Sequence, residues 1–177
     1  MTIAFTGSRP RTLWGYDIDA DRKAVDRLHR ILEGLYRENP DSCSAFVSGG
    51  AQGADQIAFK AVELLKADHP GITNRIIIPF RGQESGWSEH GLYSKEEYRL
   101  LLDSADRVDV AAGSPSRDAY MRRNRMLVDS ADAVIAIALA SPIGAATGTG
   151  STVRYAMIRG GRRVYWWDGS SDSLKRL

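Results

Sequence analysis

The sequence has few of the residues that build disulfide frameworks and metal sites. Among its 177 residues there are one cysteine and three histidines. A single cysteine, Cys43, excludes an internal disulfide framework, and three scattered histidines without a CxxC pair give no metal-ligand pattern. We therefore expect no metal and no cofactor, and the lone cysteine is typical of a protein in the reducing cytoplasm.

Long apolar runs and a large excess of one charge are also missing. No segment approaches the ~20 apolar residues that cross a bilayer, so we expect no membrane partner. Lysine and arginine exceed aspartate and glutamate by only two, and this balance does not indicate a nucleic-acid partner. No linker, repeat or low-complexity tract divides the chain. We expect a single domain over residues 1–177.

What the sequence does have is a regular alternation of short apolar runs and helical patterns. The apolar runs are nearly continuous, which is typical of parallel strands covered on both faces. The expected strands are Ile3–Thr6, Ala45–Ser48, Arg75–Pro79, Arg107–Ala111, Ala133–Leu139 and Arg163–Trp167. The expected helices are Asp19–Glu38, Gln52–Lys66, Tyr93–Ala105, Ala119–Ser130 and Ser151–Ile158. The order predicts an α/β, Rossmann-like, doubly wound and mostly parallel sheet of about six strands with helices on both faces.

Two glycine-rich loops follow expected strands and lead into expected helices. The first, SGGAQGAD, covers residues 48–55, and the second, TGTGST, covers residues 147–152. Glycine allows a tight turn and a close backbone approach, and a helix N-terminus offers free N–H groups to an anion. The second loop lacks the lysine of a P-loop and the third glycine of GxGxxG, so it is interpreted as a generic phosphate cradle. The alternative is a flexible surface turn.

Two further segments add polar groups at the same edge of the predicted sheet. TGSRP follows the first strand and supplies the turn at Gly7, the Ser8 hydroxyl and Arg9, whose guanidinium suits phosphate. The run RRNR contains Arg123 and Asn124 just before the strand that feeds the second loop. The alternatives are an ordinary turn with a solvated arginine and a solvated, charged helix face.

These segments give a set of candidate ligand-binding residues. They are Gly7, Ser8, Arg9, Gly49, Gly50, Gln52, Gly53, Asp55, Arg123, Asn124, Gly148, Thr149, Gly150, Ser151 and Thr152. Asp55 could accept a hydrogen bond from a ligand hydroxyl, or it could serve as a favourable charge in the first turn of its helix. Between residues 81 and 92 the chain has no clear periodicity, and this segment, which carries Glu89, is either a lid or a surface loop.

In this order the motifs resemble the SLOG superfamily. TGSRP, SGGAQGAD, RNRML, ADAVIAI, GTGST and GRRVYWW occur along most of the chain. The superfamily includes the DNA-processing protein A family, the lonely-guy phosphoribohydrolases and the small YspA/YpsA-like proteins of bacteria and phages. The YspA-like branch is the most similar. The resemblance implies a Rossmann-like fold, a nucleotide-type ligand and self-association into homodimers or larger assemblies.

One departure from the lonely-guy pattern bears on catalysis. The glutamate of PGGxGTxxE corresponds to Arg154 here, whereas Arg123 matches the arginine upstream. Loss of that carboxylate removes the group that would stabilise a positively charged sugar. If the protein is an enzyme, the candidate catalytic residues are Asp55, Arg123 and Glu89.

Three functions are therefore considered. The first is binding or sensing of a nucleotide or nucleotide-derived phosphorylated ligand at the carboxyl edge of the sheet. The second is hydrolysis of a nucleotide N-glycosidic bond. The third is binding of single-stranded DNA, which the sequence does not favour because it shows no basic stripe interleaved with aromatic residues.

Overall fold

The computed structural model describes residues 1–40, 43–159 and 162–177. The strands in these residues are β1 (Thr2–Gly7), β2 (Ala45–Ser48), β3 (Thr73–Ile78), β4 (Arg107–Val110), β5 (Ala133–Ile137), β6 (Arg163–Trp167) and β7 (Lys175–Arg176). The helices are α1 (Ile18–Glu38), α2 (Ala54–Asp68), α3 (Lys95–Ser104), α4 (Arg117–Asp129) and α5 (Gly148–Ile158). A short 3₁₀ turn, η1, covers Pro10–Thr12.

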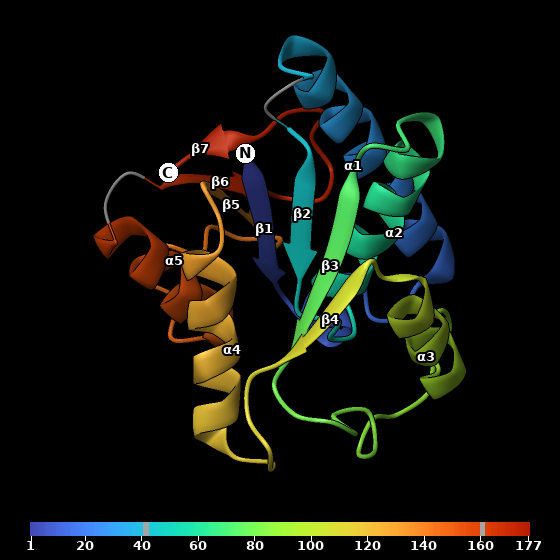
Figure 1. Ribbon diagram of the computed structural model, residues 1–177, viewed down its shortest axis with the longest axis vertical. Coiled ribbons are helices and arrows are strands. Elements are labelled where there is room, and N and C mark those ends of the chain that lie inside the picture. Colours follow the sequence, from blue (N-terminus) through green and yellow to red (C-terminus); the bar gives the residue numbers. More distant parts are fainter. Residues whose placement is uncertain (41–42, 160–161) are drawn as a thin grey trace.

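The strands form one sheet in the order β4-β3-β2-β1-β5-β6-β7 (Figure 1). All neighbouring pairs are parallel except β6 and β7. The chain first winds from β1 towards β4 and then returns to build β5 and β6 on the other side of β1. This reversal places a topological switch point at the carboxyl end of β1, where ligands of doubly wound sheets bind.

Helices cover both faces of the sheet (Figure 1). On one face, α1 and α2 pack over a core that includes Leu28, Leu65, Phe46 and Trp167. Helix α3 extends this layer through Tyr98 and Leu101, which pack against strand β3 and helix α2. On the opposite face, α4 and α5 pack over residues of five strands, including Val47 and Val134. The fold is the doubly wound α/β sheet that the alternation in the sequence predicts.

Four of the five helices in the described residues have a side-chain N-cap. Asp17, Ser94, Ser116 and Thr147 each accept hydrogen bonds from backbone N–H groups in the first turn of α1, α3, α4 and α5. Helix α2 instead begins after Gly53, which has a φ of +93° and provides no side-chain cap. The first glycine loop therefore replaces a cap with a tight backbone turn.

The differences from the predicted elements lie at their ends. Helix α5 begins at Gly148, three residues before the predicted start, because the side chain of Thr147 caps it. Strand β5 ends at Ile137, two residues earlier than predicted. The prediction missed β7, a two-residue antiparallel strand that pairs with Tyr165 and Trp166. Such a short polar strand has no apolar run to reveal it.

Candidate functional site

A cavity of about 440 Å³ opens at the switch point of the sheet. Its walls come from four segments that are far apart in the sequence: the end of β1 with η1, the first glycine loop, helix α4 and the start of α5. The lining residues are Thr6, Gly7, Ser8, Arg9, Arg11, Thr12, Ala51, Gln52, Asp55, Tyr120, Arg123, Asn124, Leu127, Thr147, Gly148 and Thr149. The volume lies in the range of small-molecule sites, about 300–1,000 Å³.

The loop after β1 is fixed by hydrogen bonds to both neighbouring walls. The Ser8 N–H donates to the Ile137 carbonyl over 2.9 Å, and the Ala54 N–H donates to the Ser8 carbonyl over 3.1 Å. Gly7 is required here because a Cβ would lie 2.3 Å from the Ile137 oxygen. The loop is thereby held at a position where Arg9 and Arg11 line the cavity.

The glycines of the first glycine loop serve close packing. A Cβ on Gly49 would lie 1.3 Å from the Arg123 guanidinium, and a Cβ on Gly53 would lie 2.5 Å from the Ser8 carbonyl oxygen. Gly50 has a φ of +67°, a conformation that favours glycine. None of these three glycines is among the described residues that line the cavity, where the loop contributes Ala51 and Gln52 instead.

A buried ion pair joins the first glycine loop to helix α4. Arg123 donates from a terminal guanidinium nitrogen to Asp55 Oδ2 over 3.0 Å, and each side chain is 8% exposed. The same Asp55 oxygen accepts a hydrogen bond from the Ala51 N–H over 3.2 Å. Asp55 therefore holds both the turn of its own loop and Arg123. The Arg123 Nε is buried without a protein partner.

Helix α5 presents its N-terminus to the cavity. Thr147 uses its hydroxyl to accept from the Gly150 N–H over 3.1 Å and its carbonyl to accept from the Ser151 N–H over 2.9 Å. As the first two residues of the helix, Gly148 and Thr149 have N–H groups without an intrahelical acceptor. Gly148 has open space at its Cβ position, so its backbone is accessible to a ligand. A helix start of this kind favours an anion.

The charge around the cavity is positive. Arg9, Arg11 and Arg123 line it, whereas Asp55 is its only carboxylate among the residues that the structure describes. Desolvation by the surrounding protein lowers the pKa of Arg9, and Asp55 opposes this shift while Arg123 adds to it. Arg9 is nevertheless an exposed residue at the mouth of the cavity, and a guanidinium stays protonated at neutral pH.

The segment from 81 to 92 packs against the first glycine loop. Gln52 donates to the carbonyls of Ser88 and Tyr93, each over 2.9 Å, and Gln83 donates to the Gly49 carbonyl over 3.3 Å. Trp87 packs on the Tyr98 ring at a centroid distance of 4.9 Å. Glu89 is exposed and is not among the residues that line the cavity, and its carboxylate accepts from the Lys95 N–H.

The structure brings together most, but not all, of the predicted site residues. Gly7, Ser8, Arg9, Gln52, Asp55, Arg123, Asn124, Gly148 and Thr149 line the cavity. Gly150 lies behind it, where a Cβ would be 2.1 Å from the Ala145 carbonyl oxygen. Ser151 and Thr152 line a neighbouring cavity instead. Residues that the sequence reasoning missed include Arg11, Thr12, Tyr120 and Thr147. The capping preference of Thr147 could have identified the true start of α5.

The comparisons with known proteins identify the family of the chain. The model of the YspA SLOG family matches residues 3–140, which include most of the cavity. The chain belongs to the YspA SLOG family. Asp55 and Arg123 both lie within the matched residues. The described part of the chain contains no helix long and apolar enough to cross a membrane and no group of three metal-ligating side chains.

Similar proteins are known from bacteria and a prophage. The SPbeta prophage-derived protein YoqJ of Bacillus subtilis is 30% identical over 146 residues, 76% of this chain and 80% of its own length. A UPF0398 protein of Halalkalibacterium halodurans is 33% identical over 94 residues, 52% of this chain and 48% of that protein.

The structure of DNA processing protein A from Streptococcus pneumoniae superposes with a TM-score of 0.58 at 24% identity. It covers 97% of this chain, but the chain spans only 53% of that protein. This likeness shows that the two proteins share a fold.

Proposed function

We propose that the protein binds a nucleotide or nucleotide-derived phosphorylated ligand in the cavity at the switch point. The observation that carries the proposal is the convergence of the α5 N-terminus with Arg9, Arg11 and Arg123 on one concave site. The amides of Gly148 and Thr149 would hold one phosphate, and the arginines would balance the remaining negative charge. Tyr120 and Leu127 would give the ligand its apolar contact.

The polar groups of the cavity favour binding over hydrolysis. Asp55 is the only carboxylate among the described lining residues, and its Oδ2 is already bound by Arg123 and by the Ala51 N–H. Arg154, at the position of the lonely-guy glutamate, donates to the Ala145 carbonyl and the Ser151 hydroxyl outside the cavity. We infer a sensor or binding module in which Asp55 is a positioning residue for Arg123.

Calorimetric titration with the four common nucleoside monophosphates tests the proposal. Removing two cavity cations by Arg9→Ala with Arg11→Ala should weaken binding by about tenfold or more, because each charge-assisted hydrogen bond contributes about 1.5–3 kcal/mol. The matched control is Arg22→Ala with Arg30→Ala, which removes two exposed charges from α1 outside the cavity. Equal weakening in both variants, or no binding by the wild type, would contradict the proposal.

Turnover is tested in the same samples. Intact nucleotide after prolonged incubation is the expected result, and release of free base with ribose 5-phosphate would make the protein an N-glycosidic hydrolase. In that case Asp55→Asn should abolish release, because Asp55 is the only cavity carboxylate in the described chain.

We also propose that the chain forms homodimers or larger assemblies. Leu139 and Ile143, which lie in the loop before α5, are 46% and 54% exposed. Large apolar side chains that stay exposed within one short loop are typical of interaction surfaces. Light scattering after size-exclusion chromatography tests this, and Ile143→Asp should shift the protein to the monomer if this loop forms the interface.

A further inference from the structure

A second cavity, of about 290 Å³, lies in the groove between helices α4 and α5. Helix α4 contributes Met121, Asn124 and Arg125, and helix α5 contributes Arg154, Tyr155 and Ile158. Asn124 lines both cavities, so the two are neighbours along α4. Ser151 and Thr152 of this second cavity follow Gly148 and Thr149 of the first by one helical turn. Along α5, the lining of the groove therefore follows directly after the lining of the first cavity.

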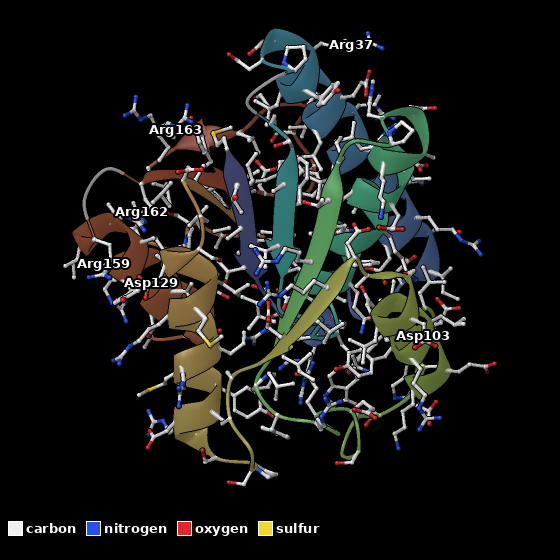
Figure 2. All side chains as sticks on the ribbon, in the orientation of Figure 1. Arg37, Asp103, Asp129, Arg159, Arg162 and Arg163 are labelled. Carbon is white, nitrogen blue, oxygen red and sulfur yellow. The ribbon has the colours of Figure 1, made fainter. Side chains whose placement is uncertain are left out.

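The sequence concentrates positive charge on this side of the molecule. From Val110 to Arg163 inclusive there are eight arginines and three aspartates, without lysine or glutamate. This stretch therefore has a net charge of +5, whereas the whole chain has +2. Near the end of α5, Arg159 pairs with the Asp129 carboxylate, and Arg162 donates to the backbone carbonyls of Val128 and Asp129 (Figure 2). These two cations are occupied by interactions inside the protein.

Arg125 and Arg154 also have no carboxylate partner among the described residues, and unlike Arg159 and Arg162 they line the groove. Arg154 is held at the groove by its bonds to the Ala145 carbonyl and the Ser151 hydroxyl, each over 3.0 Å. Arg125 lies with its guanidinium carbon 5.8 Å from the centre of the Tyr155 ring. The described lining of the groove includes both arginines and no carboxylate.

Apolar surface accompanies these charges. Met121 and Ile158 line the groove although they are 43% and 81% exposed. Tyr155 lines the groove as well, and its ring is fixed by the hydroxyl, which donates to the Asp129 carboxylate over 3.1 Å. A site with a fixed aromatic ring, exposed apolar side chains and guanidinium groups that have no carboxylate partner among the described residues suits a planar base that carries a phosphate.

We propose that the two neighbouring cavities bind one ligand with two nucleoside halves, a dinucleotide with at least two phosphates. One half occupies the cavity at the switch point, and the second half lies in the α4–α5 groove with its negative charge beside Arg125 and Arg154. Asn124, whose side chain makes no hydrogen bond to the described protein, faces the link between the halves. This inference rests on the proposed function and adds the class of ligand.

Calorimetric titrations with mononucleotides and dinucleotides test it. The probes are AMP, GMP, CMP and UMP, the pyrophosphate-linked dinucleotide NAD⁺, and the 5′-phosphorylated dinucleotides made from the same four bases. We expect the best dinucleotide to bind about tenfold or more tightly than the best mononucleotide, since the groove adds charge-assisted contacts. Arg125→Ala and Arg154→Ala should remove this difference while the mononucleotide affinity changes by less than about threefold.

Arg122→Ala is the matched control. Arg122 is an exposed arginine of the same helix that lines neither of the two cavities. It removes one charge from α4, so it should preserve the preference for the dinucleotide. If Arg122→Ala reduces the preference for the dinucleotide as much as Arg125→Ala does, the effect comes from the net positive charge of α4 and not from the groove. That result would overturn the inference.

The remaining outcomes separate this inference from the proposed function. Equal affinity for mononucleotides and dinucleotides would overturn the second subsite and leave the first cavity intact as a nucleotide site. Affinity that keeps rising from dinucleotides to ten-residue oligonucleotides would replace the dinucleotide by a nucleic-acid chain. Absence of binding by every probe would overturn the proposed function together with this inference.

Discussion

Arg123 and Asp55 form an ion pair across 3.0 Å at the floor of the cavity, with each side chain 8% exposed. The two residues are 68 positions apart in the sequence and come from helices on opposite faces of the sheet. Gly49 makes the approach possible because any Cβ there would overlap the guanidinium. The ion pair therefore connects the first glycine loop to helix α4.

Breaking this pair should destabilise the protein strongly. Asp55→Asn leaves Arg123 without its countercharge in a buried position, for which we expect a loss of about 3–5 kcal/mol in the free energy of unfolding. Arg123→Met should show a similar loss. In the double variant the two losses should not add. Urea unfolding of the wild type, both single variants and the double variant measures the coupling between Asp55 and Arg123. Strict additivity would show that the two side chains do not interact.

Two glycines of the second loop should respond in opposite ways to alanine. A Cβ at position 148 meets open space, so Gly148→Ala should leave the stability unchanged or raise it by up to about 1 kcal/mol while weakening nucleotide binding. Gly150→Ala should instead destabilise the protein by about 1–3 kcal/mol, because the Ala145 carbonyl must move. Thermal unfolding measures the stability of both variants, and calorimetric titration measures their nucleotide binding. Unchanged nucleotide binding in Gly148→Ala would argue against a ligand at this backbone.

Gln52 should control the order of the segment from 81 to 93. Its amide donates to the carbonyls of Ser88 and Tyr93 in a buried position, and Gln52→Met leaves both without a donor. We expect a loss of about 1–3 kcal/mol and faster proteolysis after Arg81. Ser85→Ala, at an exposed position of the same segment, is the control. If trypsin cuts both variants at the wild-type rate, these bonds do not hold the segment.

Asp21 should make the stability depend on pH. It is buried at 2% exposure, and burial raises the pKa of its carboxyl, an effect that the nearby Tyr93 hydroxyl partly offsets. Below the ordinary aspartate pKa both folded and unfolded states are protonated, so Asp21 causes no change there. As pH rises from that value through the raised native pKa, the unfolded state ionises first and the wild type loses stability.

Asp21→Asn removes this titration. The variant should therefore unfold at the same temperature as the wild type near pH 3 and at a higher temperature at pH 7. Each 1 kcal/mol of stability corresponds to about 2–4 °C for a chain of this size. Differential scanning calorimetry at both pH values measures the gap. A gap that is independent of pH, or one that favours the wild type at pH 7, would show that the carboxyl is not penalised by burial.

The sheet could be predicted because its strands and helices each follow from a pattern of apolar residues within a short stretch of the sequence. Apolar runs such as residues 133–139 mark buried parallel strands, and one-sided apolar patterns mark the helices between them. The meeting of the β1 loop, the first glycine loop and the start of α5 follows from the order of these elements, since parallel strands end at one edge. The cavity could therefore be placed, though not measured, from sequence.

The roles of individual residues could not be predicted in the same way. Glycines 49, 50 and 53 were expected to approach a ligand, whereas the structure shows them packed against Arg123, strand β3 with helix α3, and Ser8. Whether a glycine faces a ligand or a neighbouring side chain depends on tertiary packing, which a loop sequence does not encode. Arg11 was missed for a related reason. Only the turn of η1 directs it into the cavity, and no periodicity signals so short a turn.

The central claim is that the free amides of Gly148 and Thr149 bind a phosphate of the ligand. Amide proton–nitrogen correlation spectra of isotopically labelled protein, recorded during a nucleotide titration, test this most directly. We predict that the resonances of Gly148 and Thr149 shift progressively and saturate with the affinity found by calorimetry, while those of exposed α1 residues stay in place. Saturable binding that leaves both resonances unmoved would contradict the account.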